Sequence, residues 1–160
     1  MKKLFNKDQK GFTIIEVMIV LAIAGLIIGV VLVAIPQLQR NQRNSSRKSI
    51  VSRIKTEIDN YQGNNNGKIP TAAADITSFT TRYLTGVNRD DPKLATPMPV
   101  SYVTTATDYT AGSVFVGTVG TISYKDAVTC DGELAATGSA RQYAMWTRLE
   151  GDAIYCVDNK

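Results

Sequence analysis

Residues 17–35 read VMIVLAIAGLIIGVVLVAI, a run of 19 residues without one charged or hydrogen-bonding side chain. At about 1.5 Å of rise per residue, a helix of this length is close to the roughly 30 Å thickness of a bilayer core. A cleavable secretory signal explains the run poorly, because its apolar part spans only about 7–15 residues before a polar cleavage region. The run therefore predicts an N-terminal helix that can span a membrane.

The charges around this run predict its orientation. Four lysines and one aspartate lie within residues 1–11, and positively charged flanks stay on the cytoplasmic side of a membrane. The rest of the chain is then exported, together with its only two cysteines, Cys130 and Cys156. Because disulfides persist outside the cytoplasm, we expect these two cysteines to form one.

The composition of the 160 residues argues against most catalytic and metal sites. The chain contains no histidine, which excludes Ser-His-Asp triads and the common zinc and iron motifs built on histidine. Asp126, Asp131 and Glu133 lie close together in the sequence but match no calcium-binding loop. We therefore expect no enzyme, no cofactor and no metal site.

Glu16 is a carboxylate at the start of the apolar segment, where a charge is costly and usually functional. The expected helix offers no cation to pair with it, so its partner should come from elsewhere. A cut between Gly11 and Phe12 would create such a cation, the new amino terminus of Phe12. A second copy of the chain could then bring this amine to Glu16 when apolar helices bundle together.

Residues 10–16, KGFTIIE, and the following VMIVLAIAG resemble the class III signal sequence of type IV pilins and the related pseudopilins. The resemblance implies that a membrane prepilin peptidase removes the leader, residues 1–11, after Gly11 and that Phe12 is then N-methylated. Residues 12–36 would remain as a transmembrane and filament-core helix. The resemblance also implies that Glu16 neutralises the Phe12 amine of a neighbouring subunit.

The same resemblance implies where the chain is found before and after assembly. The chain would sit in the cytoplasmic membrane with its N-terminus inside, and then enter an extracellular helical homo-oligomer. Its partners would be a pilus assembly platform and an assembly ATPase, and its tasks twitching motility, adhesion or DNA uptake. The alternatives are a minor pilin, a type II secretion pseudopilin, or a signal-anchored surface binding protein that does not polymerise.

Three residues bear on the shape and packing of the long helix expected from residue 12 to about residue 62. Gly25 and Gly29 form a small-xxx-small step, which lets apolar helices approach closely. Pro36 lacks a backbone N–H and should kink or break the helix nearby. In assembled pili the stretch between a glycine and a proline is often melted, and residues 25–36 resemble that stretch, with the proline three residues later than usual.

Residues 37–62 predict an amphipathic helix that packs on a head domain. Its basic residues, between Arg40 and Lys55, have three interpretations: a solvated face, contact with anionic lipid headgroups, or pairing with acidic heads of adjacent subunits. DNA binding lacks support, because no aromatic residues interleave with the charges. The sequence GNNNG at 63–67 should end the helix. The apolar stripe of this helix consists of Ile50, Val51, Ile54, Ile58 and Tyr61.

Residues 63–160 should form a β-rich globular head with a C-terminal region bounded by the disulfide. A connecting region at 68–111 precedes the strands and contains a short helix near 76–84, and Asp90 and Asp91 are interpreted as a turn. We expect an α+β fold with a three- to four-stranded antiparallel sheet and the helix end on one face, as in type IV pilins. The strands are expected at 113–119, 121–125, 142–149 and 153–157.

Overall fold

A computed structural model describes residues 11–104, 109 and 111–160 of the chain. The chain divides into two compact units, Met1–Gln39 and Arg40–Lys160. Residues 1–10 of the expected leader lie outside the described residues, so Gly11 is the first residue of the chain with a described position.

One long helix, α1, runs from Ile14 to Asn64, close to the expected 12–62. Pro36 lies inside this helix and does not end it; of the expected kink or break, the break does not occur in the single chain, and the kink stays a prediction. Proline removes one intrahelical hydrogen bond, and the bonds of the flanking turns are sufficient to continue the helix. The helix ends where expected, because Asn66 and Gly67 take positive φ angles of 55° and 78°.

The first unit contains the apolar part of α1. An 18-residue window of α1 has a mean hydropathy of 3.2, and none of it is buried. By length and composition this part can cross a membrane. The side chains of residues 11–39 are exposed or half-buried throughout, so these described residues form no hydrophobic core among themselves.

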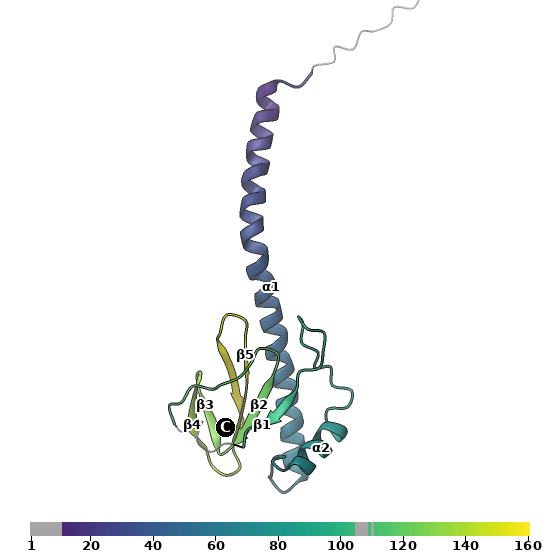
Figure 1. The fold of residues 1–160 in the computed structure, drawn as a ribbon, viewed down its shortest axis with the longest axis vertical. Helices are drawn as coiled ribbons and strands as arrows, with labels where there is room; N and C mark the ends of the chain where they lie inside the picture. The colour runs from purple at the N-terminus through teal and green to yellow at the C-terminus, as the bar shows by residue number, and fades with distance from the viewer. Residues whose placement is uncertain (1–10, 105–108, 110) are drawn as a thin grey trace, which may run out of the picture. The chain divides into compact units, whose positions relative to one another are not determined.

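In the second unit, the C-terminal half of α1 packs on a four-stranded sheet with the order β1-β2-β5-β6 (Figure 1). The strands are β1 (Val100–Tyr102), β2 (Ile122–Asp126), β5 (Tyr143–Arg148) and β6 (Ile154–Asp158). β2, β5 and β6 pair antiparallel, as expected, whereas β1, a strand not expected from the sequence, pairs parallel to β2. Parallel neighbours need a long crossover, and residues 103–121 are long enough for one.

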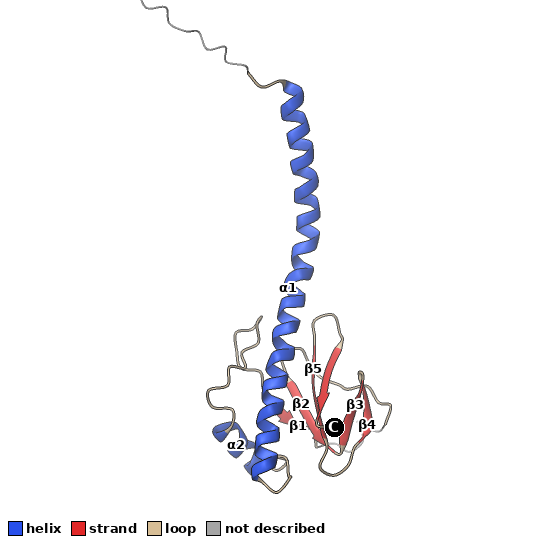
Figure 2. Cartoon of the chain, turned by 180° about the vertical axis from the view of Figure 1, so that it is seen from behind, coloured by secondary structure: helices blue, strands red, loops and turns tan. Residues whose placement is uncertain are grey.

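A second, two-stranded sheet consists of the hairpin β3 (Val128–Asp131) and β4 (Leu134–Thr137). A second helix, α2 (Ala73–Arg82), covers nearly the same residues as the short helix expected near 76–84. Figure 2 shows α2 and the β3–β4 hairpin on opposite sides of α1, as does Figure 1. The fold is therefore α+β, with two helices and mainly antiparallel strands.

The strand expected at 113–119 does not form. Only single bridges occur there, between Val114 and Leu134 and between Val119 and Arg148. The indole N–H of Trp146 donates to the carbonyl of Val116 at 2.9 Å, which uses a backbone group that a strand would need. β-branched residues here thus form a loop over a buried tryptophan.

The head contains two groups of buried apolar side chains. The first fills the space between α1, α2 and the sheet, and includes the whole stripe expected on α1. The second lies under the β3–β4 hairpin and contains Phe115, Val128, Ala135, Ala144 and Trp146. The core position expected for the apolar stripe of residues 50–61 is thus confirmed.

Candidate functional site

The N-terminal end of α1 is a capping box made of Thr13 and Glu16. The backbone N–H and the hydroxyl of Thr13 both donate to Oε2 of Glu16, at 2.9 and 2.7 Å. The Thr13 hydroxyl in turn accepts from the backbone N–H of Glu16 at 3.3 Å. These reciprocal bonds satisfy N–H groups that a helix start leaves open.

This geometry adds to what the sequence indicates about Glu16. The chain itself offers Glu16 two donors, although neither carries a charge. Both bonds reach the same oxygen, Oε2, so the carboxylate is held in one orientation while Oε1 takes neither bond. Phe12, the residue expected to supply the amine, precedes the box and is 89% exposed.

The other helix residues singled out from the sequence lie in open surroundings. A Cβ atom built at Gly25 or Gly29 would meet nothing within 4 Å. Both positions are therefore accessible to a neighbouring helix, as a small-xxx-small step requires. Pro36 lies on the same exposed stretch of α1.

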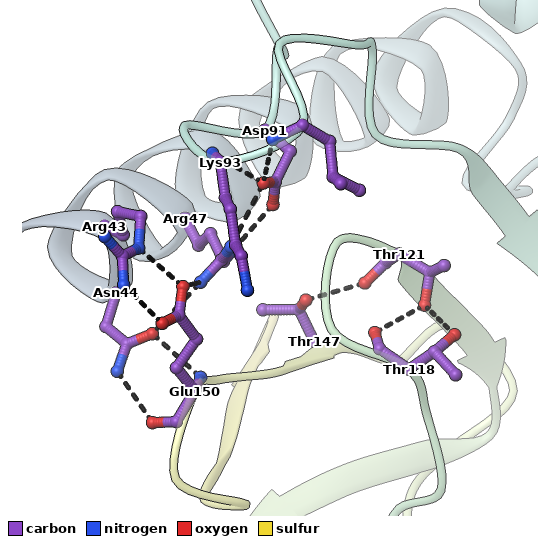
Figure 3. A network of polar contacts seen from close by, with 10 residues as sticks. Arg43, Asn44, Arg47, Asp91, Lys93, Thr118, Thr121, Thr147 and Glu150 are labelled. Atoms are coloured by element: carbon purple, nitrogen blue, oxygen red, sulfur yellow. Dashed lines mark hydrogen bonds and ion pairs between the residues drawn. The ribbon is translucent and has the colours of Figure 1, made fainter. Parts of the chain in front are cut away.

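A buried ion-pair network joins α1 to two loops within the second unit (Figure 3). Arg47 lies at its centre, with a side chain only 1% exposed. Its guanidinium binds both oxygens of Asp91, at 2.7 and 3.1 Å, and Oε1 of Glu150 at 2.9 Å. Bidentate contacts of this kind are the strongest that arginine makes with a carboxylate.

Arg43 and Asn44 complete the network one turn earlier on α1. Arg43 donates to both oxygens of Glu150, at 2.7 and 2.6 Å. The amide of Asn44 donates to the carbonyl of Glu150 at 3.0 Å and accepts its N–H at 2.9 Å. Glu150, in the turn between β5 and β6, is thus bound through both its side chain and its backbone.

The network keeps both of its carboxylates ionised. The hydrogen bonds from Arg43, helped by those from Arg47, lower the pKa of Glu150 to about 2. Burial alone raises the pKa of Asp91, but the hydrogen bonds from Arg47 and from the N–H groups of Lys93 and Leu94 outweigh burial and lower it. Two arginines and two carboxylates therefore balance in charge.

The sequence alone does not reveal this network. It assigns the basic band from Arg40 to Lys55 to solvent, lipid headgroups or neighbouring subunits, but Arg43 and Arg47 pair within their own chain. Asp91 does lie in a turn, where its Oδ1 accepts the N–H groups of Lys93 and Leu94 at 2.8 and 3.0 Å. The sequence does contain one indication that Arg47 faces the head: Arg47 is three residues before Ile50 and therefore lies on the same face of the helix as the apolar stripe.

The cysteines and the acidic residues near them have structural partners. Cys130 and Cys156 form the expected disulfide, which ties β3 to β6. Asp126 accepts the hydroxyl of Tyr102 at 2.6 Å, and Glu133 accepts the N–H of Ile154 at 3.2 Å. Among the described residues, no group of three or more acidic or cysteine side chains is arranged to hold a metal ion.

An exposed apolar N-terminal helix with a carboxylate at its start, followed by a small sheet packed on its C-terminal half, defines the type IV pilin fold. Residues 6–34 match the family described as the prokaryotic N-terminal methylation motif, which is the class III signal of type IV pilins. No curated protein and no solved structure matches this chain.

The motif supports membership of the type IV pilin or pseudopilin group. It implies processing by a prepilin peptidase and assembly into a pilus-type filament in general. Together with the apolar helix, it supports membrane anchoring and a place in a surface pilus. Proteins with this motif are structural subunits rather than enzymes.

Proposed function

We propose that this chain is the major subunit of a type IV pilus. It is held in the cytoplasmic membrane by the transmembrane helix 12–36, with its N-terminus inside, and is cleaved after Gly11 and N-methylated at Phe12. It then joins a helical homo-oligomer outside the cell. The observation that carries this proposal is the methylation motif at residues 6–34, which overlaps the apolar N-terminal part of α1, where the described side chains are exposed or half-buried.

Glu16 is the docking residue in this proposal. The capping box engages Oε2, and we assign Oε1 to the methylated amine of Phe12 in a neighbouring subunit. An amine next to a carboxylate neutralises it in the apolar filament core, where either charge alone is costly. Because one subunit gives the amine and the next gives the carboxylate, the contact repeats without closing and produces a filament.

Gly25 and Gly29 give the helices a place for close contact, since neither has a neighbour within 4 Å of a built Cβ. Around Pro36 one helical hydrogen bond is missing, which makes residues 25–36 the stretch of α1 that opens most easily on assembly. An assembly platform and an ATPase supply the energy. The filament serves motility, adhesion or DNA uptake.

The first test is intact mass together with N-terminal sequencing of material sheared from cells. The expected chain begins at N-methylated Phe12 and is lighter by the two hydrogens lost in the disulfide. A chain that begins at Met1 and is found only in membranes would contradict the proposal and leave a signal-anchored binding protein.

The second test replaces Glu16 with alanine, with Thr13→Val as a matched change in the same helical turn. We expect Glu16→Ala to leave cleavage intact and to lower the yield of sheared filaments strongly, because the docking carboxylate is gone. Thr13→Val keeps the carboxylate and should reduce the yield less. An unchanged yield for Glu16→Ala would remove its docking role.

A minor pilin or a type II secretion pseudopilin is the second candidate, because both carry the same motif. The amount of the chain in purified filaments separates the cases. A major pilin forms most of the filament mass, whereas a minor pilin is a trace component. A pseudopilin is required for protein secretion and forms short periplasmic filaments.

A further inference from the structure

A polar trough lies in the head where α1 ends, and neither filament docking nor the ion-pair network uses it. Its main hollow of about 590 Å³ is lined by, among others, Tyr61, Asn64, Asn65, Lys68, Asp75 and Asp126. A second hollow of about 330 Å³ shares four of these residues and ends at Arg82 and Tyr83. Because they share these lining residues, the two hollows are adjacent, and together they are called the trough; its lining comes from the end of α1, from α2 and from the end of β2.

The hydrogen bonds inside the trough determine what it presents to a ligand. The side-chain N–H₂ of Asn64 donates to the hydroxyl of Tyr83 at 3.1 Å, and that of Asn65 donates to the carbonyl of Tyr61 at 2.7 Å. Both asparagines are thus held through nitrogen, and their amide oxygens remain acceptors. The exposed carboxylate of Asp75, in the first turn of α2, adds two more acceptor oxygens.

The charges of the trough cancel. The lining contains two acidic residues, Asp75 and Asp126, and two basic residues, Lys68 and Arg82, so it carries no net charge. A polyanion would meet two carboxylates, and a multivalent cation would meet two basic side chains. An apolar ligand would find a lining made largely of amides and charged groups, unlike the apolar walls typical of pockets for such ligands.

Packing and hydrogen bonds fix the elements that carry the trough. The rings of Tyr61, Phe79 and Tyr83 pack on one another, with centroids 5.4–5.8 Å apart, and fix α2 against the end of α1. The hydroxyl of Tyr124 donates to the carbonyl of Pro70 at 2.5 Å, and that of Tyr102 donates to Asp126 at 2.6 Å. A site held in this way loses little conformational entropy when a ligand binds.

From these features we propose that the trough binds a neutral saccharide. Sugar hydroxyls both donate and accept, which suits acceptor-rich amides and carboxylates with lysine and arginine donors at the two ends. Tyr83 is half-buried and lines the second hollow, and its ring stacks on Phe79 on one side. We assign the other side of the ring to the C–H face of a sugar. The proposal is independent of filament assembly, because it concerns only the head.

The test uses the purified full chain in detergent micelles on an array of neutral and sialylated oligosaccharides, followed by calorimetric titration of the strongest neutral ligand. Two variants address the trough. Asp75→Ala removes an acceptor, and Ala140→Trp adds bulk at an exposed lining residue. Asp131→Ala, at an exposed position on the β3–β4 hairpin, is the matched control.

We expect binding of neutral glycans that depends little on salt. Asp75→Ala should weaken it about tenfold, the effect of one lost hydrogen bond of about 1.4 kcal/mol. Ala140→Trp should abolish binding, and Asp131→Ala should leave it unchanged. The unfolding midpoint of each variant shows whether the head is intact, and Ala140 takes part in none of the hydrogen bonds described above.

Three results would overturn the proposal. One is an array on which no neutral glycan binds the wild-type chain. Another is equal affinity for the wild type, Asp75→Ala and Ala140→Trp. The third is a preference for anionic glycans with a steep salt dependence, which would indicate a polyanion site.

Discussion

Residues 14–39 and residues 40–160 use apolar side chains in opposite ways. Leu21, Leu26 and Leu32 are 66–71% exposed, whereas Ile54 and Ile58, on the same helix, are fully buried. A contiguous apolar surface of this kind needs a membrane or a protein partner. One helix thus contains a part whose stability depends on its surroundings and a part that completes its own core.

If these two regions are energetically independent, changes in the head should alter its folding but not membrane anchoring. Changes in the apolar segment should alter membrane anchoring but not the folding of the head. Trp146 is the only tryptophan and is fully buried in the head. Its fluorescence in urea titrations of the full chain in micelles therefore measures the unfolding of the head alone.

The largest effect should come from Arg47→Met. This change leaves Asp91 buried at 1% exposure without its cation, which should cost about 3–5 kcal/mol of unfolding free energy. Arg53→Met, at an exposed position on the same helix, is the control and should change stability by less than about 0.5 kcal/mol. Equal midpoints for the two variants would show that the network contributes nothing.

Loss of the disulfide should come next. On the chain-entropy model, closing a loop between positions 26 residues apart is worth about 3.5 kcal/mol. The double variant Cys130→Ser/Cys156→Ser should lose about this much in the same urea titration, and the wild type should match it after reduction. A double variant that lost membrane association while its head stayed stable would contradict the independence of the two regions.

A charge placed in the apolar segment tests whether this segment controls membrane anchoring alone. Leu26→Arg places a cation near the middle of the run and should raise the cost of membrane insertion by about 2.5–3.5 kcal/mol. The fraction of the chain retained in carbonate-washed membranes measures this effect. The Trp146 unfolding curve should not change, and a shifted curve would show that the two regions are energetically coupled.

The last test concerns the dependence of head stability on pH. The folded pKa of Glu150 is about 2, below the usual 4.5, so the folded head binds fewer protons than the unfolded chain. The contribution of Glu150 is complete above about pH 4.5 and is lost as the pH falls toward 2. Glu150→Gln should therefore be less stable at neutral pH and show a shallower acid dependence; an unchanged slope would assign the dependence to other carboxylates.

The sequence predicts those parts of the molecule that depend on local patterns. The apolar run, the stripe from Ile50 to Tyr61, and the asparagine and glycine stop at 63–67 all follow from helical periodicity and from turn chemistry. β5 and β6 are predictable because their residues alternate and a clear turn separates them. The disulfide follows because the chain has only two cysteines.

The remaining features depend on contacts between residues far apart in the chain. Arg47 binds Asp91 across 44 positions and Glu150 across 103, and nothing in the local sequence names these partners. β1 is only three residues long and forms by pairing with β2, so its own residues give little indication of a strand. Residues 113–119 have strand-like composition, but the hydrogen bond from Trp146 to the Val116 carbonyl keeps them in a loop. Tertiary contacts override local propensity in these places.

The polar trough is not predictable from the sequence either. Its asparagines indicate only a helix stop, and that interpretation is correct for the backbone. Their side chains gain a second role only when α2 and the end of β2 are placed beside them, which local sequence patterns do not determine.

The disulfide also affects how the head survives cleavage by proteases. Cys130 and Cys156 close a ring that contains β4 and β5 and both exposed turns around them, at Gly132 and Gly151. A single cut anywhere within this ring opens it but releases no fragment, because the two new ends remain joined through sulfur. The most accessible turns of the C-terminal region can thus be nicked while every strand stays covalently attached.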